Sequence, residues 1–443
     1  MEQGLKKLGL CPTGLSYTMR TMSMDVQKRE MKNGLVVATE VMPHLRSVSL
    51  GVWIKGGSRF EKTNNTGISH FIEHLLFKGT RKRSAGKIAE VIDSIGGQLN
   101  AFTEKEYVGF YAKVLDEHLP LAFDLVSDIV LHPIFPADEI ERERNVIFEE
   151  INMVEDSPQE LILDLFMESF WKNHPLGRPI SGTKGSVAKI SRNDVKKYFQ
   201  NNYSADNTIV AIAGNIRHRE AYKLAERYFS GLKPGRVVDP GPPPGVHASR
   251  LIRNKSHLEQ THICLGTTAP PVVSGERFCA HLLSNILGGG MSSRLFQNVR
   301  ERRGLVYSIY SMLNLYRDAG SLVVYAGTAH DKASEVVDLV LKEFGSLRTK
   351  LVAAQELKRA KEYVKGSVML SLESSSSRMT HLAQQLIYYG RFYRLEEILD
   401  SVERVTARDI RNLANRIFDD STLALTALNS RNGRDLNTVA IHV

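Results

Sequence analysis

Two histidines and a glutamate lie close together in the segment 67–77, in the pattern H-x-x-E-H. His70 and His74 are four residues apart, and Glu73 directly precedes the second histidine. Residues four apart on a helix are neighbours on one face, so the two imidazoles can bind the same ion. The pattern is the inverted form of a zinc-binding helix in which the carboxylate takes a proton from water. The segment therefore indicates metal-assisted hydrolysis, and the alternative is that the histidines are solvated or structural.

The same segment carries an apolar stripe, which predicts a helix packed against a core. The spacing of the apolar residues is i, i+3, i+4, i+7 and i+8, as expected of one buried helix face. These residues are Ile68, Phe71, Ile72, Leu75 and Leu76. Because the stripe fills the face toward the core, the three polar residues are expected to project from the other side.

A third metal ligand is expected, since zinc in hydrolases usually takes three protein ligands and leaves one position for water. The segment 140–154 predicts a helix whose apolar stripe includes two carboxylates, Glu143 and Glu150. A carboxylate on a buried stripe is costly unless it is paired with a cation. We therefore interpret Glu150 as the third ligand and Glu143 as a carboxylate that hydrogen-bonds a ligand histidine. The alternative is an internal ion pair with Arg144 or a solvated, charged face.

Together the two segments resemble the pitrilysin family of zinc peptidases, in the branch that includes the subunits of mitochondrial processing peptidase and their bacterial relatives. The resemblance rests on the H-x-x-E-H pattern and on the run Glu-Arg-Glu-Arg-Asn-Val-Ile-Phe-Glu-Glu at 141–150. It covers nearly the whole chain from residue 28 onward. It implies that Glu73 is the general base, that Glu143 supports the site, and that each chain binds one zinc ion. The implied ligands are His70, His74 and Glu150.

The resemblance also implies residues that contact a substrate. A strand expected at the edge of the active site would pair with an extended peptide by β-augmentation, and the alternative is an edge strand without a ligand. The backbone residues concerned are Asn100, Ala101 and Phe102. Arg300 and Tyr307 look like the arginine and tyrosine pair of the family, which would hold the substrate backbone and donate a hydrogen bond to the developing oxyanion. The alternative for this pair is a surface arginine and a core tyrosine.

Composition and charge indicate an ordinary globular protein. The 443 residues are enough for two or more domains, and 42% apolar with 24% charged residues is typical of soluble chains. The net charge is +9, but basic and acidic residues alternate, so a basic surface that selects peptides by charge is at least as consistent as nucleic-acid binding. Three cysteines without C-x-x-C spacing favour a reducing compartment.

The chain is predicted to contain two copies of one unit, joined by the Pro/Gly-rich run 239–245. Predicted strands and helices recur in the same order on both sides of this run. The predicted fold class is α+β, with two homologous α/β domains, each a mostly antiparallel sheet packed against helices, related by internal duplication. The predicted segments are a disordered N-terminal extension (1–27), a metal-binding catalytic domain (28–232), a linker (233–250) and a homologous domain that lacks the metal motif and contributes substrate contacts (251–443).

We therefore expect a zinc-dependent endopeptidase that cuts short or unfolded peptides inside a chamber. Longer members of the family build the chamber from four such units, whereas this chain has two, so two chains should associate. A homodimer is expected because the chain retains both the metal motif and the arginine and tyrosine pair. The alternatives are a heterodimer with a related subunit and a non-catalytic or regulatory role in a heterodimeric processing peptidase. We expect a bacterial cytoplasmic protein, or alternatively a mitochondrial matrix protein, with neither nucleic acid nor a membrane as partner.

Overall fold

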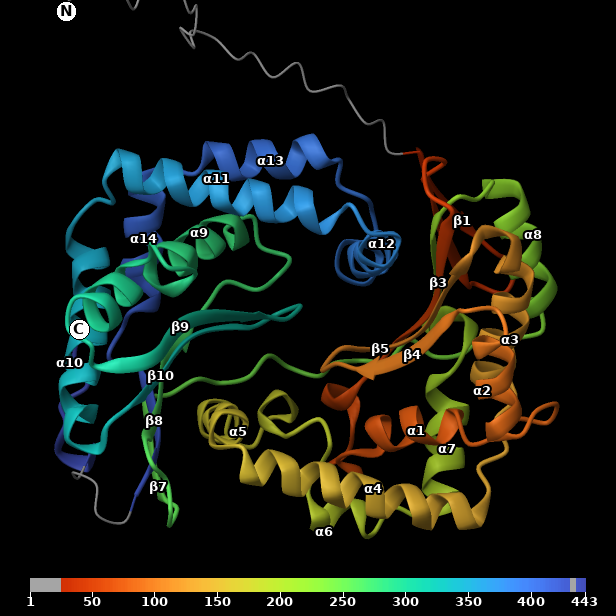
Figure 1. The fold of residues 1–443 in the computed structure, drawn as a ribbon, viewed down its shortest axis with the longest axis horizontal. Helices are drawn as coiled ribbons and strands as arrows, with labels where there is room; N and C mark the ends of the chain where they lie inside the picture. The colour runs from red at the N-terminus through yellow and green to blue at the C-terminus, as the bar shows by residue number, and fades with distance from the viewer. Residues whose placement is uncertain (1–24, 431–435) are drawn as a thin grey trace, which may run out of the picture.

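A six-stranded sheet forms the centre of the first half of the molecule. The computed structural model describes residues 25–430 and 436–443, and Figure 1 shows the two halves side by side. The strand order is β1-β2-β6-β3-β5-β4, and all neighbouring strands are antiparallel except β2 and β6. The strands are β1 (Asp25–Glu30), β2 (Val36–Val41), β3 (Ser47–Lys55), β4 (Gln98–Thr103), β5 (Tyr107–Leu115) and β6 (Thr208–Gly214).

The second half contains a five-stranded sheet that repeats this arrangement. Its order is β7-β11-β8-β10-β9, and the one parallel pair, β7 with β11, matches the pair β2 with β6. The strands are β7 (Ser249–Asn254), β8 (Thr261–Thr268), β9 (Val306–Leu315), β10 (Gly320–Thr328) and β11 (Ala424–Asn429). The predicted fold class, two mostly antiparallel sheets packed against helices, is confirmed.

Helices cover both faces of each sheet. Those of the first half are α1 (Ile68–Leu76), α2 (Ala85–Asp93), α3 (Leu119–Leu131), α4 (Ala137–Asp156), α5 (Pro158–Phe170), α6 (Lys184–Val187), α7 (Arg192–Asn202) and α8 (His218–Phe229). Those of the second half are α9 (Arg277–Gly288), α10 (Ala333–Thr349), α11 (Ala354–Ser371), α12 (Ser375–Tyr389), α13 (Leu395–Arg404) and α14 (Ala407–Ile417). The apolar stripe of α1 is fully buried, in one core with residues of β3, β5 and α3.

The two halves exchange helices. Helix α5, from the first half, packs against β7, β8 and β11 of the second sheet, where Phe166 and Phe170 join a core with Val323. Helix α12, from the second half, packs against β2, β3 and β6 of the first sheet, where Met379 lies in a core with Trp53. Each sheet therefore has one face covered by a helix from the other half (Figure 1). The predicted boundaries of the domains stay a prediction, but neither half completes its core alone.

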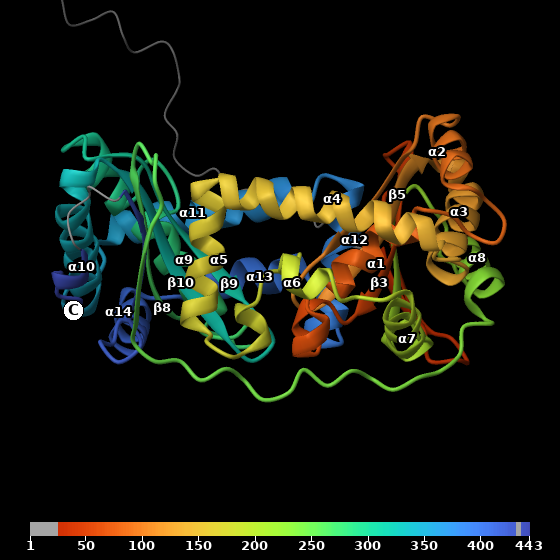
Figure 2. The same ribbon diagram turned by 90° about the horizontal axis from the view of Figure 1, so that it is seen from below.

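The segments at the predicted boundaries differ from expectation in detail. Strand β1 begins at Asp25, so the prediction of a disordered extension up to residue 27 is wrong for its last three residues. Their backbone pairs with β2, although most of their side chains are exposed and show no apolar pattern; residues 1–24 lie outside the described residues. The predicted linker runs between the halves without helix or strand until β7 begins at Ser249 (Figure 2). No described helix combines the length and apolar composition needed to cross a membrane.

Candidate metal centre

The start of helix α1 is fixed by a glycine and by a buried carboxylate. Gly67 has φ 95°, a conformation that favours glycine, and a Cβ there would lie 2.6 Å from the carbonyl oxygen of Ser181. Glu61 is buried and accepts hydrogen bonds from the backbone N–H groups of Gly67 and Ser69, both at 2.8 Å. These N–H groups lack partners within the helix, so Glu61 caps α1 and fixes the position of its polar face.

The three predicted metal ligands lie together between α1 and α4. The distance from His70 Nε2 to Glu150 Oε2 is 3.6 Å, as is that from His74 Nε2 to Glu150 Oε1. One ligand atom from each of the three residues lies within 4.8 Å of the other two. Ligand atoms about 2.1 Å from a tetrahedral zinc ion are about 3.4 Å apart, so this group has the spacing that zinc requires. Two imidazoles and one carboxylate are also the donor set of many catalytic zinc sites.

Burial keeps His70 uncharged. Burial, with a smaller effect of His74, lowers the pKa of His70 to about 4. At neutral pH its imidazole therefore has a free lone pair, which metal binding requires. The Nδ1 atom of His70 is buried and has no hydrogen-bond partner among the described residues.

Glu143 orients the other histidine. It is buried, accepts a hydrogen bond of 3.1 Å from His74 Nδ1, and forms an ion pair of 2.7 Å with Lys78. With the proton on Nδ1, the Nε2 atom of His74 faces Glu150 and can bind a metal. The alternative pairing of Glu143 and Glu150 with Arg144 is wrong, because Arg144 binds Glu141 and backbone carbonyl groups.

Glu73 lies beside the ligands and is held by strand β4. Its Oε2 accepts a hydrogen bond of 2.6 Å from the Thr103 hydroxyl. Burial raises the pKa of Glu73, and the hydrogen bond from Thr103 opposes this increase. Thr103 thus holds one carboxylate oxygen, while the other accepts no hydrogen bond from the described residues, which suits a group that accepts a proton from water.

Strand β4 lies at the edge of the first sheet and pairs only with β5 among the described strands. Its other edge is open, as β-augmentation by an extended peptide requires. Asn100 is exposed, and Ala101 and Phe102 are partly buried. The predicted contact residues therefore lie on the strand that holds Glu73 through Thr103.

Arg300 and Tyr307 do not lie near this group within one chain. Tyr307 is 77% exposed at the start of β9, so it is not a core residue, and the Arg300 guanidinium lies 5.6 Å from its ring centroid. The far tip of the β9–β10 hairpin is the part that reaches the first half, where Asp318 binds Arg59. Since β9 is ten residues long, it separates the pair from that tip by roughly 30 Å.

Three residues that support the site were not predicted from the sequence. Lys78 lies four residues after His74, which could have placed it beside the same carboxylate. Thr103 follows the predicted contact residues on the same strand, but its partner on α1 is distant in sequence. Glu61 precedes the helix by several residues and does not show the usual capping pattern. The last two contacts are set by the tertiary structure.

Comparison with known proteins gives consistent similarities over most of the chain. Residues 36–184 match the family described as insulinase (peptidase family M16), and residues 189–364 match the peptidase M16 inactive domain. An uncharacterized zinc protease of Bacillus subtilis is 39% identical over 401 residues, covering 90% of this chain and 98% of the relative. One of Mycobacterium leprae is 38% identical over 404 residues, covering 90% of each chain.

Two solved structures share the fold. A protease from Helicobacter pylori aligns with a TM-score of 0.87 at 23% identity, covering 92% of this chain and 99% of that one. A peptidase M16 inactive domain from Pseudomonas fluorescens aligns with a TM-score of 0.86 at 21% identity, covering 93% and 100%. At these identities the likeness concerns the fold alone.

Proposed function

Because the chain belongs to the M16 peptidase family, we propose that it is a zinc-dependent endopeptidase that hydrolyses short or unfolded peptides. The observation that carries the proposal is the convergence of His70, His74 and Glu150 beside the carboxylate of Glu73. The two imidazoles and the Glu150 carboxylate would hold one zinc ion per chain. From the resemblance of the segments 67–77 and 141–150, we also propose that the chain belongs to the branch that includes processing peptidases and their bacterial relatives.

Different residues of the chain would have different roles in hydrolysis. A bound zinc ion supplies Lewis-acid polarisation of the substrate carbonyl and makes water easier to deprotonate. Glu73 would accept the proton of the attacking water on Oε1, while Thr103 holds Oε2 in place. The same carboxyl group could then give that proton to the nitrogen of the leaving amine. Glu143 keeps the proton of His74 on Nδ1 throughout the reaction.

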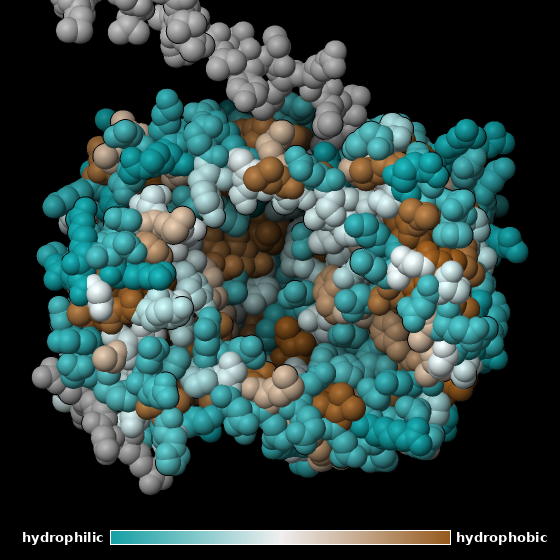
Figure 3. Space-filling view, viewed as in Figure 1, coloured by the Kyte–Doolittle hydropathy of each residue, from teal (hydrophilic) through white to brown (hydrophobic). Residues whose placement is uncertain are grey.

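The substrate would bind as an additional strand on the open edge of β4. Main-chain hydrogen bonds to Asn100, Ala101 and Phe102 would provide affinity without requiring one side-chain sequence. Figure 3 shows a deep opening between the two halves, with apolar residues in its depth. We expect an extended peptide, and not a folded domain, to enter this opening, which favours unfolded substrates.

We also propose that two chains associate so that the second half of one serves the metal centre of the other. Because the length of β9 separates them from the hairpin tip that contacts the first half, Arg300 and Tyr307 lie far from the metal ligands of their own chain, and Tyr307 is exposed. In a homodimer this pair could reach the site of the partner and enclose a chamber. Arg300 would then hold the substrate backbone, and Tyr307 would donate a hydrogen bond to the oxyanion.

Replacement of the general base tests the proposed function. Glu73→Gln keeps the shape of the side chain but cannot accept the proton, so cleavage of an unstructured fluorogenic peptide should fall by about 10²–10⁴-fold. Zinc content, measured by atomic absorption, should remain one ion per chain. Glu90→Gln on α2, where Glu90 is exposed and paired with Lys87, is the matched control and should change neither quantity.

Two results would contradict the proposal. Unchanged cleavage by Glu73→Gln would show that another group accepts the proton. A wild-type chain that binds no zinc and cleaves no peptide would favour the alternative of a non-catalytic subunit.

A further inference from the structure

A large cavity lies on the face of β4 opposite Glu73. Side chains alternate along a strand, so Gln98 and Phe102 point to one face of β4 while Thr103 points to α1 and Glu73. The cavity on the Gln98 and Phe102 side has a volume of about 760 Å³ and is also lined by α9, α12 and the loop that precedes α9. The opening in Figure 3 lies over these elements.

One arginine in the wall of this cavity, Arg277, is buried and has no described carboxylate as an ion-pair partner. Arg277 is 8% exposed, and its Nη1 donates a hydrogen bond of 2.9 Å to the carbonyl oxygen of Ser274. Three aromatic rings surround the guanidinium, with centroids at 4.3–5.2 Å. These rings belong to Phe278, Tyr389 and Tyr393. The neighbouring carboxylate of Glu276 binds Arg416 instead, at 2.7 Å, and no described carboxylate forms an ion pair with Arg277.

The other titratable groups that line the cavity do not neutralise this charge. His281 and His381 both have a lowered pKa, mainly because of burial, with Arg277 and Arg378 adding to the effect. Both imidazoles are therefore uncharged at neutral pH. Glu104 is the one carboxyl group among the described lining residues, and it forms no ion pair with Arg277; burial raises its pKa, while Lys105 opposes this. Arg277 thus places a positive charge in the wall of a largely apolar cavity without a carboxylate partner among the described residues, and such a partner would stabilise a buried cation.

We propose that this cavity binds a carboxylate of the peptide that is being cleaved, with Arg277 as its partner. The inference rests on the proposed function, because a peptide paired with the open edge of β4 would direct alternate side chains toward Glu73 and toward this cavity. The carboxylate can come from an aspartate or glutamate side chain or from the C-terminus of the peptide. A planar guanidinium suits either source, and the aromatic rings exclude water around it.

Binding to an inactive chain tests the proposal without cleavage. The full-length Glu73→Gln chain is titrated with fluorescein-labelled neutral peptides in which a single glutamate is moved through every position. Each peptide has a glutamine twin, and each is made with a free and an amidated C-terminus. One glutamate position, or the free C-terminus, should bind on the order of tenfold more tightly than its uncharged twin. A preferred glutamate position would identify a side chain as the source of the bound carboxylate, and a preference for the free C-terminus would identify the C-terminus. Either result supports the proposal.

Two substitutions should remove this preference. Arg277→Gln should abolish it while the affinity for the glutamine twin stays the same. Gln98→Glu adds a negative charge at an exposed position of β4, where misfolding is not expected, and should also abolish it. Arg217→Gln, at a side chain that is 84% exposed and does not line the cavity, is the control and should keep it.

Two outcomes would overturn the inference. One is the absence of any preferred glutamate position or free C-terminus. The other is an equal loss of affinity for charged and neutral twins in Arg277→Gln, because this would give Arg277 a packing role only. The wild-type chain is assayed for cleavage of the same peptides. Cleavage without a carboxylate preference rejects this inference alone, whereas a preference without cleavage rejects the proposed function and leaves the cavity as a carboxylate-binding site only.

Discussion

Glu143 contacts both a predicted metal ligand and a lysine: one of its oxygens lies against His74 and the other against Lys78. Glu143→Gln keeps the size of the side chain but weakens both contacts, so the ring of His74 loses part of its orientation. We expect the zinc affinity to fall about 10–100-fold, as found for the groups that orient metal-binding histidines. Competition with a chromophoric chelator measures this change. Glu149→Gln, at an exposed position of the same helix, should leave the affinity unaltered, and an equal loss in both variants would argue against the orienting role.

Thr103 adjusts the acidity of Glu73 through one hydrogen bond. Burial raises the pKa of Glu73, and the Thr103 hydroxyl lowers it by binding the charged carboxylate. Thr103→Val removes this bond, so the pKa should rise and the base should stay protonated to a higher pH. The acidic limb of the kcat/KM profile should therefore move up by about one pH unit. Thr103→Ser retains the hydroxyl and should keep the wild-type profile. If the acidic limb of Thr103→Val stays where it is in the wild type, the Thr103 hydroxyl does not lower the pKa of Glu73.

At the scale of the element, the buried Glu61 makes the stability of helix α1 depend on pH. Burial raises the pKa of Glu61 to about 7, although hydrogen bonds from Ser69 and Gly67 oppose this. Between pH 4.5 and pH 7 the folded chain therefore binds more protons than the unfolded chain, and stability is lost as the pH rises. The loss attributable to Glu61 should reach at most about 3 kcal/mol across this interval.

Glu61→Gln removes the titration and isolates this effect. The free energy of unfolding of wild type, minus that of the variant, should decrease from pH 4.5 to pH 7.5 in urea titrations with a chelator present. Other titrating groups cancel in the difference. A difference that stays constant with pH would show that Glu61 titrates normally.

The sequence predicts those features of the metal centre and the fold that depend on local spacing. It does not predict the features that depend on contacts between distant segments. The apolar stripe and the two histidines of α1 follow from helical periodicity, and the position of Glu150 follows from a carboxylate on another such stripe. The exchange of α5 and α12 was not predicted, because an apolar helix face does not identify the sheet that it will cover. Contacts of Thr103 and Glu61 join segments that come together only in the folded chain.

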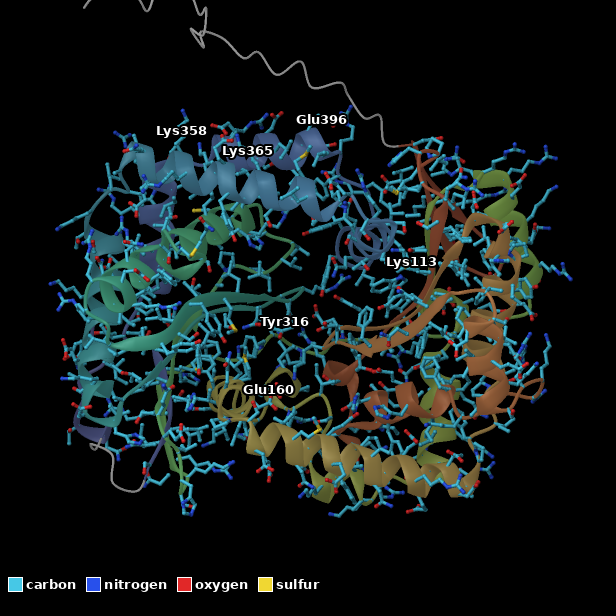
Figure 4. The ribbon with its side chains drawn as sticks, viewed as in Figure 1. Lys113, Glu160, Tyr316, Lys358, Lys365 and Glu396 are labelled. Atoms are coloured by element: carbon cyan, nitrogen blue, oxygen red, sulfur yellow. The ribbon has the colours of Figure 1, made fainter. Side chains whose placement is uncertain are left out.

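At the scale of the whole molecule, a buried ion pair fixes the second half to the first. Arg59 is 1% exposed and donates to both oxygens of Asp318 at 2.6 and 2.7 Å and to Glu106 at 2.7 Å. Asp318 lies at the tip of the β9–β10 hairpin, beside Tyr316, which Figure 4 marks. The hairpin therefore enters the first half through a charged contact, while the exchanged helices provide the apolar contacts.

Asp318→Asn leaves the Arg59 charge with a weaker partner. We expect a loss of about 1–3 kcal/mol in the free energy of unfolding, less than for a buried charge left alone, because Glu106 still binds Arg59 and Asp318 is 26% exposed. Urea denaturation measures the loss. Asp331→Asn, whose partner is the exposed Lys332, should cost less than about 1 kcal/mol. Similar losses in the two variants would mean that the contact between the halves depends on the exchanged helices alone.

The proposed sharing of residues between two chains predicts complementation between two inactive variants. Glu73→Gln lacks the base, and Tyr307→Phe lacks the hydroxyl that would donate to the oxyanion in the other chain, so each homodimer should be nearly inactive. In a mixed dimer, the site with Glu73 intact would receive Tyr307 from the Glu73→Gln chain and regain both groups. Random exchange makes about half of the dimers mixed, each with one competent site of two, so activity should recover to about a quarter of wild type. Recovery that rises with the time allowed for subunit exchange would support a shared site. If Tyr307 served its own chain, no mixed dimer would contain a complete site, and mixing would restore nothing.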